Sequence, residues 1–421
     1  MKHLRIVGAG WAGLAAAVAA VQDGWQVDLY DTAHSPGGRA RSLTQCFAGH
    51  RLDNGQHVLI GAYRDTLALM HTVGLEPKVL LKRVPLNLRF ANGQGLALPD
   101  LAAPWNALAG IVLAAGWRWT DKLSLLRACW QWQRNDFGCD ATWTVTQLCA
   151  YSTLTSRVVQ QMVEPLCLSA LNTPCNKASA LVFLRVLRDA LLGGPGSADL
   201  LIPTTDLNAL LPDACVRWLQ EHGAQVHLGR RVTTAELPST DIQTHHDQAF
   251  VLACPSWEAA RLTANIYPAW SQQAANLSHT AITTVYLHCT DMGFEGLTQP
   301  MLALQSDAKQ PAQFVFDRGA LTQQPGLLAC VVSDSQGERD DIAWRVQQQV
   351  AQQLGLSSLH IVQTVVEKRA TLACTPAQLR PQSRIAQNLF ACGDYVRGPY
   401  PSTLEGAVRS GQQVIAQLRD R

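Results

Sequence analysis

His57, Tyr395 and Tyr400 are the side chains in this sequence whose types and neighbours fit acid–base chemistry. An imidazole titrates near neutrality, so His57 would be the natural proton donor. Tyr395 or Tyr400 is an alternative donor, and the face of either ring could also stabilise a cation. Pro399 and Pro401 flank Tyr400 and would hold it rigidly. The competing interpretations are a histidine satisfied beneath a loop and tyrosines that only pack against their neighbours.

A glycine run near the start of the chain could hold a ligand on which such residues act. Gly8, Gly10 and Gly13 have G-x-G-x-x-G spacing and follow a short apolar segment. An alanine-rich segment at 14–21 comes next, and another apolar segment lies at 26–30. This order predicts a strand, a tight turn, a helix and a second strand, which together form a βαβ unit. The N-terminus of such a helix attracts a pyrophosphate.

The side chains around this unit would complete a dinucleotide site. Asp31 ends the second strand, where a carboxylate accepts hydrogen bonds from a ribose hydroxyl. Trp11 and Ala12 begin the helix at the phosphates, and Gly38 with Arg39 could add a second phosphate contact. The competing interpretations are a strand-to-helix turn without a ligand and an ordinary Pro-Gly-Gly turn with a solvated arginine.

The C-terminal part of the sequence predicts a second ligand-binding segment. A buried strand over 388–395 ends in Gly-Asp, and the Asp394 carboxylate could accept hydrogen bonds from polyol hydroxyls. A helix then begins, and Ser402 and Glu405 have the spacing of a capping box. The residues that we expect to contact the ligand here are Gly393, Asp394, Ser402, Thr403 and Leu404.

These segments resemble a known group of flavoproteins. The glycine run and Gly37–Arg39 resemble the FAD-dependent amine oxidase and carotenoid desaturase superfamily. Gly393–Tyr395 also carries the match, and the more specific segments are 53–57, which reads Asp-Asn-Gly-Gln-His, and 398–407, which reads Gly-Pro-Tyr-Pro-Ser-Thr-Leu-Glu-Gly-Ala. They resemble one family within it, the squalene-associated hydroxysqualene dehydroxylases of bacterial hopanoid pathways. The stretch 140–385 contributes no segment to this resemblance.

The resemblance implies a cofactor and a reaction. The cofactor would be tightly bound FAD, contacted also by Gly55, Gln56 and Val232. The helix that begins near 402 would stabilise the anionic reduced flavin. The reaction would be reductive removal of the hydroxyl group from hydroxysqualene, an isoprenoid lipid, to give squalene. Only one dinucleotide fingerprint is present, so the sequence offers no NAD(P)H site and leaves the electron donor unknown.

Three other functions stay open at this point. A carotenoid or squalene-like desaturase would use the same fold and flavin in the oxidative direction. An amine oxidase would need a polar pocket that recognises an amine, which the low charge of the sequence does not favour. A flavin-binding or membrane-scaffold protein without activity would need the cofactor but no reactive pocket.

Length and composition exclude some classes of protein. The formal net charge is +2, so nothing indicates a nucleic-acid partner. The twelve cysteines are scattered singly, and the twelve histidines, including His245 and His246, lack the spacing of metal ligands. We therefore expect reduced thiols and no metal site. Charged residues make up only 16% of the chain, which favours an apolar substrate or surface.

The chain of 421 residues is too long for one core. We predict an α/β fold with a Rossmann-type FAD-binding domain interleaved with a substrate domain of mixed sheet plus helices. The FAD-binding domain would comprise 1–83, 200–260 and 385–421, and the substrate domain 84–199 and 261–384.

Residues 104–134 combine a short apolar segment with five tryptophans and several cations. The apolar segment is too short to span a bilayer, so we expect either helices lying in a membrane interface or a pair of core helices. The N-terminus enters a strand within a few residues, leaving no room for a signal peptide. We expect a cytoplasmic protein, with peripheral contact on the inner face of the cytoplasmic membrane if the interface interpretation holds.

Overall fold

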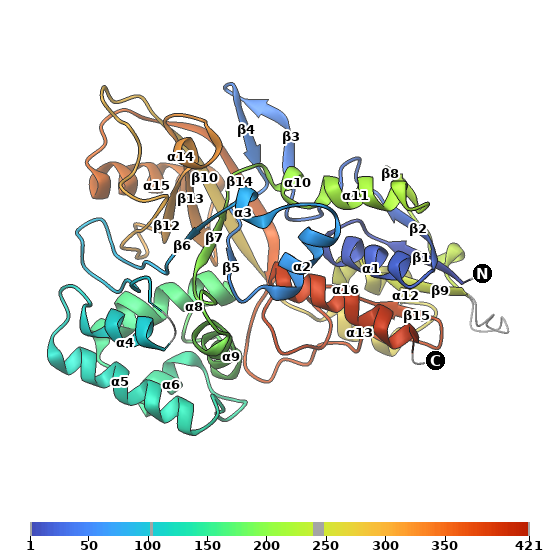
Figure 1. Cartoon of the computed structure of the whole chain (residues 1–421), viewed down its shortest axis with the longest axis horizontal. Helices are drawn as coiled ribbons and strands as arrows, with labels where there is room; N and C mark the ends of the chain where they lie inside the picture. The colour runs from blue at the N-terminus through green and yellow to red at the C-terminus, as the bar shows by residue number, and fades with distance from the viewer. Residues whose placement is uncertain (1, 102–103, 239–247, 420–421) are drawn as a thin grey trace.

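The computed structural model describes residues 2–101, 104–238 and 248–419, so His245 and His246 lie outside the described residues. Two sheets form the frame of the molecule, and a group of helices covers the end farthest from the two termini (Figure 1). This arrangement confirms the predicted α/β fold class with a Rossmann-like parallel sheet.

The first sheet is parallel and is assembled from distant parts of the chain. Its strands in spatial order are β15 (Leu389–Ala391), β9 (Gln248–Leu252), β1 (His3–Val7), β2 (Gln26–Asp31) and β8 (Gln225–Leu228). Alternate side chains point to opposite faces, so Val251 and Phe390 join one core while Leu252 and Leu389 join another. The sheet is thus buried on both faces. The predicted borders between the FAD-binding domain and the substrate domain stay a prediction.

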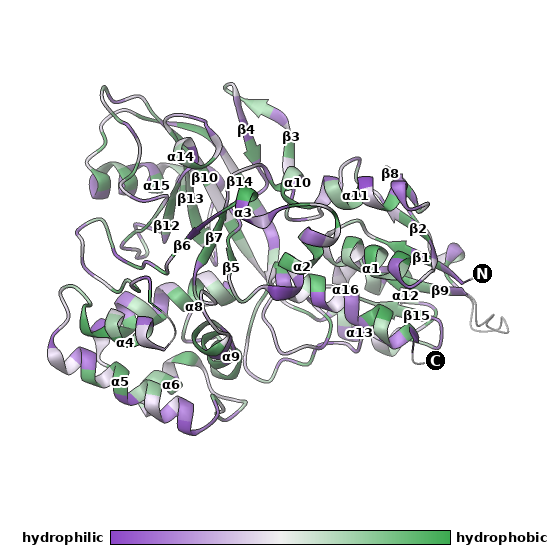
Figure 2. Cartoon of the chain, viewed as in Figure 1, coloured by the Kyte–Doolittle hydropathy of each residue, from purple (hydrophilic) through white to green (hydrophobic). Residues whose placement is uncertain are grey.

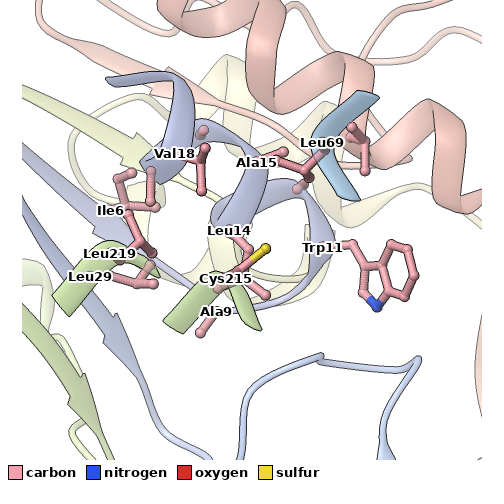
Figure 3. Packing of buried hydrophobic residues seen from close by; sticks show 14 of the residues in the cluster. Ile6, Ala9, Trp11, Leu14, Ala15, Val18, Leu29, Leu69, Cys215 and Leu219 are labelled. Atoms are coloured by element: carbon pink, nitrogen blue, oxygen red, sulfur yellow. The ribbon is translucent and has the colours of Figure 1, made fainter. Parts of the chain in front are cut away.

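Helices cover both faces of the parallel sheet. One face is covered by α1 (Trp11–Gln22), α11 (Pro212–Glu221) and α16 (Leu404–Arg419), with α2 (Arg64–Thr72) beside α16. The other is covered by α12 (Ser256–Thr263) and α13 (Pro268–Ala275). Figure 3 shows the first face, where Leu14 and Val18 of α1 pack among Ile6, Leu29 and Leu219. The alanine-rich sequence of α1 lets its neighbours approach closely.

The second sheet is antiparallel, not mixed as predicted. Its strands in spatial order are β11 (Met301–Ala303), β12 (Phe314–Asp317), β13 (Leu327–Ser333), β10 (His279–Cys289) and β14 (Leu359–Leu372). The links 304–313 and 318–326 are shorter than the roughly dozen residues that parallel neighbours need. The second link contains α14 (Arg318–Thr322), and α15 (Arg339–Leu354) packs against the sheet.

Two smaller sheets and several short helices connect the frame. A hairpin pairs β3 (Ser42–Phe47) with β4 (His50–Asp53), and β7 (Leu200–Pro203) lies between β5 (Leu59–Ile60) and β6 (Leu81–Val84). The short helices are α3 (Pro77–Leu80), α10 (Leu207–Leu210) and the 3₁₀ turn η2 (Thr234–Glu236).

The remaining helices form the end opposite the termini (Figure 1). They are α4 (Trp105–Val112), α5 (Trp119–Arg134), α6 (Val145–Tyr151), α7 (Ser156–Val158), the π-helical turn η1 (Val159–Val163), α8 (Glu164–Leu171) and α9 (Ala180–Leu192). The π turn precedes Pro165, whose missing N–H and bulky ring disfavour a regular α-helical turn there. Hydrophobic colouring in Figure 2 is interrupted by hydrophilic residues along α5, as expected for a helix with one exposed face.

Candidate flavin and substrate site

A cavity of about 720 Å³ collects nearly all the residues that the sequence singled out. It lies at the carboxyl ends of the parallel strands, where Val7, Asp31, Ala253 and Gly393 line it, and open α/β sheets bind ligands at this edge. The predicted residues that line it are Gly8, Gly10, Trp11, Ala12, Asp31, Gly38, Arg39, Gly55, Gln56, His57, Val232, Gly393, Asp394, Tyr395, Tyr400, Ser402, Thr403 and Leu404. Gly13 does not line it.

The glycine turn presents a helix end to this cavity. Gly8 has a φ of +115°, and a Cβ there would lie 2.6 Å from the carbonyl oxygen of Ala253, so only glycine fits. Gly10 forms the N-cap of α1 without a side-chain cap, and the first turn of the helix contains no acid. The first N–H groups of the helix therefore carry uncompensated partial positive charge beside the cavity. This geometry fits a phosphate group.

Gly13 serves packing instead of ligand contact. A Cβ at this position would lie 1.8 Å from the carbonyl oxygen of Gly8. The spacing predicted this close approach of helix and strand. Its place in the glycine motif also predicted a cofactor contact for Gly13, but the structure gives this residue a packing role instead.

Asp31 fastens the glycine turn. Its carboxylate accepts hydrogen bonds from the backbone N–H of Ala9, at 2.6 Å, and of Ala33, at 2.8 Å. The sequence predicted a ribose contact and did not indicate this structural role. Since a carboxylate has about four acceptor sites, the ribose contact stays a prediction alongside it.

Arg39 and Asp394, predicted as separate cofactor contacts, are paired with each other. The Nη2 atom of Arg39 lies 2.6 Å from Oδ1 of Asp394, and its Nη1 donates to the carbonyl of Ala370 at 2.7 Å. Burial raises the pKa of Asp394, but the charge and hydrogen bond of Arg39 outweigh burial and lower it below its usual value. The carboxylate is therefore ionised and held in place at the cavity wall.

The predicted capping box at the C-terminal helix is wrong. The hydroxyl of Thr403 caps α16 by accepting from the N–H of Gly406 at 3.0 Å, while Ser402 accepts from Leu372 at 3.0 Å. Glu405 instead accepts from the N–H and hydroxyl of Thr66 and so caps α2. A capping-box spacing fits either arrangement, and only the tertiary contact between the two helices decides.

The reason for assigning His57 as proton donor also fails. Burial, followed by the positive charge of Arg39, lowers the pKa of His57 to about 4. The imidazole is therefore neutral near pH 7, and its remaining N–H is a much weaker acid than an imidazolium. It still lines the cavity and can form hydrogen bonds there.

The two tyrosines occupy different surroundings. The hydroxyl of Tyr400 accepts from Arg409 at 2.9 Å and from Arg185 at 3.5 Å, and both guanidinium groups lie over its ring. A third cation on that ring would be repelled, so the predicted cation-stabilising role is not favoured for Tyr400. Tyr395 is 2% exposed, burial raises its pKa, and its hydroxyl has no hydrogen-bond partner among the described residues. A ligand group in the cavity could supply that missing partner.

The sequence missed the residue that anchors segment 53–57. Arg318 and Asp53 are 3% and 2% exposed at their side chains, and their Nη2 and Oδ2 atoms lie 3.2 Å apart. Nη1 of Arg318 also donates to Gln56 at 3.3 Å, and the hydroxyl of Tyr286 donates to the Asp53 carbonyl at 3.0 Å. No pattern near Arg318 signals this contact, since its partners lie far away in the sequence.

The sequence also missed the apolar part of the cavity. This part is enclosed by the helical end of the molecule and the antiparallel sheet. Its walls include Leu86, Leu88, Leu96, Ile111, Leu125, Met162, Phe183, Met301, Phe314 and Phe316. These are ordinary core residue types, and only the fold shows that they enclose a space.

Among the described residues, neither a group of metal ligands nor a membrane-spanning helix is found. None of their His, Cys, Asp and Glu side chains group as a metal site would require. Their helices are all too short or too polar to cross a bilayer. All twelve cysteines are free thiols, as expected.

Comparison with known proteins adds a family and a fold. The model of the family "Flavin containing amine oxidoreductase" matches residues 11–418. The hydroxysqualene dehydroxylase of Zymomonas mobilis is 25% identical over 98% of both chains, and that of Rhodopseudomonas palustris is 27% identical over 98% of this chain and 97% of its own. The crystal structure of an oxidoreductase from Methanosarcina mazei has a similar fold, with a TM-score of 0.71, 15% identity and coverage of 98% and 100%.

Proposed function

Because the chain belongs to the flavin-containing amine oxidoreductase family, we propose that it binds FAD and reductively removes the hydroxyl group of hydroxysqualene to give squalene. The observation that carries this proposal is the division of one cavity into two parts. Glycine turns and the Arg39–Asp394 pair bound one part, and apolar side chains enclose the other. The first part fits a flavin dinucleotide, and the second fits an isoprenoid chain. The similarity to hydroxysqualene dehydroxylases over nearly the full length supports the same substrate.

Each part of the cofactor would have its own contacts among the residues that line the cavity. The N-terminus of α1 and the backbone at Gly38 would hold the pyrophosphate, and Asp31 the ribose. Asp394 would accept from the ribityl hydroxyls, with Arg39 keeping it ionised. The N-terminus of α16 would face the flavin ring and stabilise negative charge there.

One hydride, which carries two electrons and a proton, and one further proton are required for the proposed reaction. The hydride for the carbon that loses the hydroxyl is the chemistry that reduced FAD would supply when bound, and that hydroxyl would take up a proton and leave as water. The loss leaves an allylic cation on the substrate, which the apolar walls shield from attack by water. In this balance the carbon–oxygen bond breaks and a carbon–hydrogen bond forms, and the products would be squalene, water and oxidised cofactor.

Tyr400 is the residue that best fits the proton donor. His57 is neutral, because burial and Arg39 lower its pKa to about 4. The hydroxyl of Tyr400 accepts from Arg409 and Arg185, which leaves its own proton free to be donated. The two guanidinium groups also fix the position of the Tyr400 hydroxyl at the cavity wall.

Product analysis tests the function. Purified protein loaded with FAD and given hydroxysqualene with a chemical reductant should form squalene, and omission of the reductant should stop the reaction. A chemical reductant is used because the natural electron donor is unidentified. A product with additional double bonds, formed by oxidised enzyme, would instead indicate a desaturase. Absence of any turnover with flavin bound would contradict the proposal.

Single-turnover kinetics test the proton donor. Tyr400→Phe should slow reoxidation of the reduced enzyme by substrate by at least about 10²-fold, since general acids contribute that much or more. His57→Gln should slow it far less, because the N–H of a neutral imidazole is a much weaker acid than an imidazolium. Flavin content of both variants should equal that of the wild type. If Tyr400→Phe reacts at the wild-type rate, another group delivers the proton.

A further inference from the structure

The exposed faces of α4 and α5 form the densest group of exposed large apolar side chains along the described chain. Trp105, Leu113, Trp119, Leu123 and Trp130 are all more than half exposed, and we call these five residues the α4–α5 patch. A helix repeats every 3.6 residues, so Trp119, Leu123 and Trp130 lie on one side of α5. Helices α4 and α5 lie at the end of the molecule opposite the two termini (Figure 1).

The tryptophans of this stretch divide between core and surface. Trp117 is 7% exposed and donates to Gln161 at 2.8 Å, and Trp132 is buried and donates to Ser152 at 2.9 Å. Trp119, by contrast, is 67% exposed. The core interpretation of 104–134 therefore holds for one side of each helix, while the membrane-interface interpretation stays a prediction for the exposed side.

The charges beside the patch are almost all positive. Arg118, Lys122, Arg127 and Arg134 lie in this stretch, and Asp121 is its single acid. Asp121 is buried and accepts hydrogen bonds from the N–H of Arg118 and the hydroxyl of Thr155. Its charge is thus turned inward. Lys122 lies over the ring of Trp119 and Arg134 over that of Trp130, which places cations at the same level as the aromatic rings.

We propose that the α4–α5 patch docks the protein on the surface of an anionic lipid bilayer. Tryptophan, leucine and basic side chains on one helix face are the combination that lies in a membrane interface, with rings at the headgroup level and cations against lipid phosphates. A second copy of this chain fits less well, because a two-fold contact would bring the cations of one patch against those of the other.

The patch is connected to the cavity by the helices that carry it. Ala107 and Ile111 of α4 and Leu125 and Cys129 of α5 line the apolar part of the cavity. The bilayer and the cavity would thus be separated by a single layer of helices, about 10 Å thick. The isoprenoid substrate would then enter the cavity from the bilayer. This entry step rests on the proposed function, whereas docking itself does not.

Vesicle sedimentation without substrate tests the docking surface. Flavin-loaded protein should sediment with vesicles of phosphatidylcholine and phosphatidylglycerol and less with phosphatidylcholine alone. The triple variant Trp119→Ser/Leu123→Ser/Trp130→Ser should lower the partition coefficient by about tenfold or more while flavin stays bound. Arg127→Gln/Arg134→Gln should remove the preference for anionic vesicles. Trp344→Ser is the matched control, an exposed tryptophan on α15, and should sediment as the wild type does.

Several outcomes would overturn the docking surface. One is wild-type protein that stays in the supernatant with both kinds of vesicle; another is a triple variant that sediments as the wild type does. Light scattering gives a third, since a triple variant that changes from dimer to monomer with unchanged sedimentation would identify the patch as a subunit contact. Vesicle binding without squalene formation would refute only the proposed reaction.

Discussion

Protein carrying Gly13→Ala should purify with little or no flavin and unfold at a lower temperature than the wild type. The added Cβ would lie 1.8 Å from the Gly8 carbonyl oxygen and 3.0 Å from the Cβ of Ala253. Neither partner is the far end of a flexible side chain, so α1 must move away from the strand and the glycine turn. Overpacking of this kind costs up to about 3 kcal/mol, and occasionally more. If that cost falls on the FAD-bound state, the affinity for FAD decreases by about 10²-fold.

Gly10→Ala provides the contrast. The nearest atom to a Cβ there is the Cα of Gly38 at 3.8 Å, and the backbone conformation of Gly10 is one that alanine adopts. The flavin-free variant should therefore unfold at the wild-type temperature, while its affinity for FAD falls because the methyl group occupies the approach to the pyrophosphate. Flavin absorbance of the purified proteins and thermal unfolding of the flavin-free forms measure the two effects. A Gly13→Ala protein with full flavin and unchanged unfolding would refute the packing argument.

Arg318→Met should destabilise the protein by about 3–5 kcal/mol, because it leaves the buried carboxylate of Asp53 without its charged partner. The midpoint of denaturant unfolding measures this loss. Arg339→Met removes an exposed partner of Asp340 and should change stability by no more than about 1 kcal/mol. The double variant Asp53→Asn/Arg318→Met should recover part of the loss, since it removes the orphaned charge.

The loss of stability caused by Arg318→Met alone should be largest at neutral pH. Burial raises the pKa of Asp53 above its usual value even though Arg318 opposes the shift. For a carboxyl with a raised pKa, its contribution to stability is complete below the unfolded pKa and is lost as pH rises through the folded pKa. Removing Arg318 raises the folded pKa further, so the deficit should narrow as pH falls. A deficit independent of pH would show that the carboxylate is not its cause.

The sequence predicted best what depends on neighbours along the chain. The strand, glycine turn and helix at 3–22 lie within three residues of their predicted bounds, because glycine spacing and apolar runs act locally. The residues of the glycine turn and of the C-terminal helix start were also identified from local signals, and they line the cavity. The sequence could not predict that Trp117 is buried and Trp119 exposed, since the composition of 104–134 suits both core helices and helices in a membrane interface.

What the sequence could not predict are pairings across long separations. Asp394 was expected to bind a polyol and Arg39 a phosphate, and nothing in the sequence indicated that the two also pair with each other. Glu405 was expected to cap its own helix and instead caps α2. The lowered pKa of His57 likewise arises from burial and from Arg39, neither of which is visible in the residues around it. Each of these partners is fixed by tertiary packing.

The order in which ribosomes deliver the chain has a consequence for this site. Strand β1 emerges first, but its sheet is finished by β15, and α1 packs so closely on α16 that a Cβ at Gly411 would lie 2.2 Å from the Ala12 carbonyl. The N-terminal glycine motif therefore lacks its final neighbours until β15 and α16 have been translated. During that interval we expect its apolar helix to lack its final cover, which would open it to chaperones and proteases before the fold is complete.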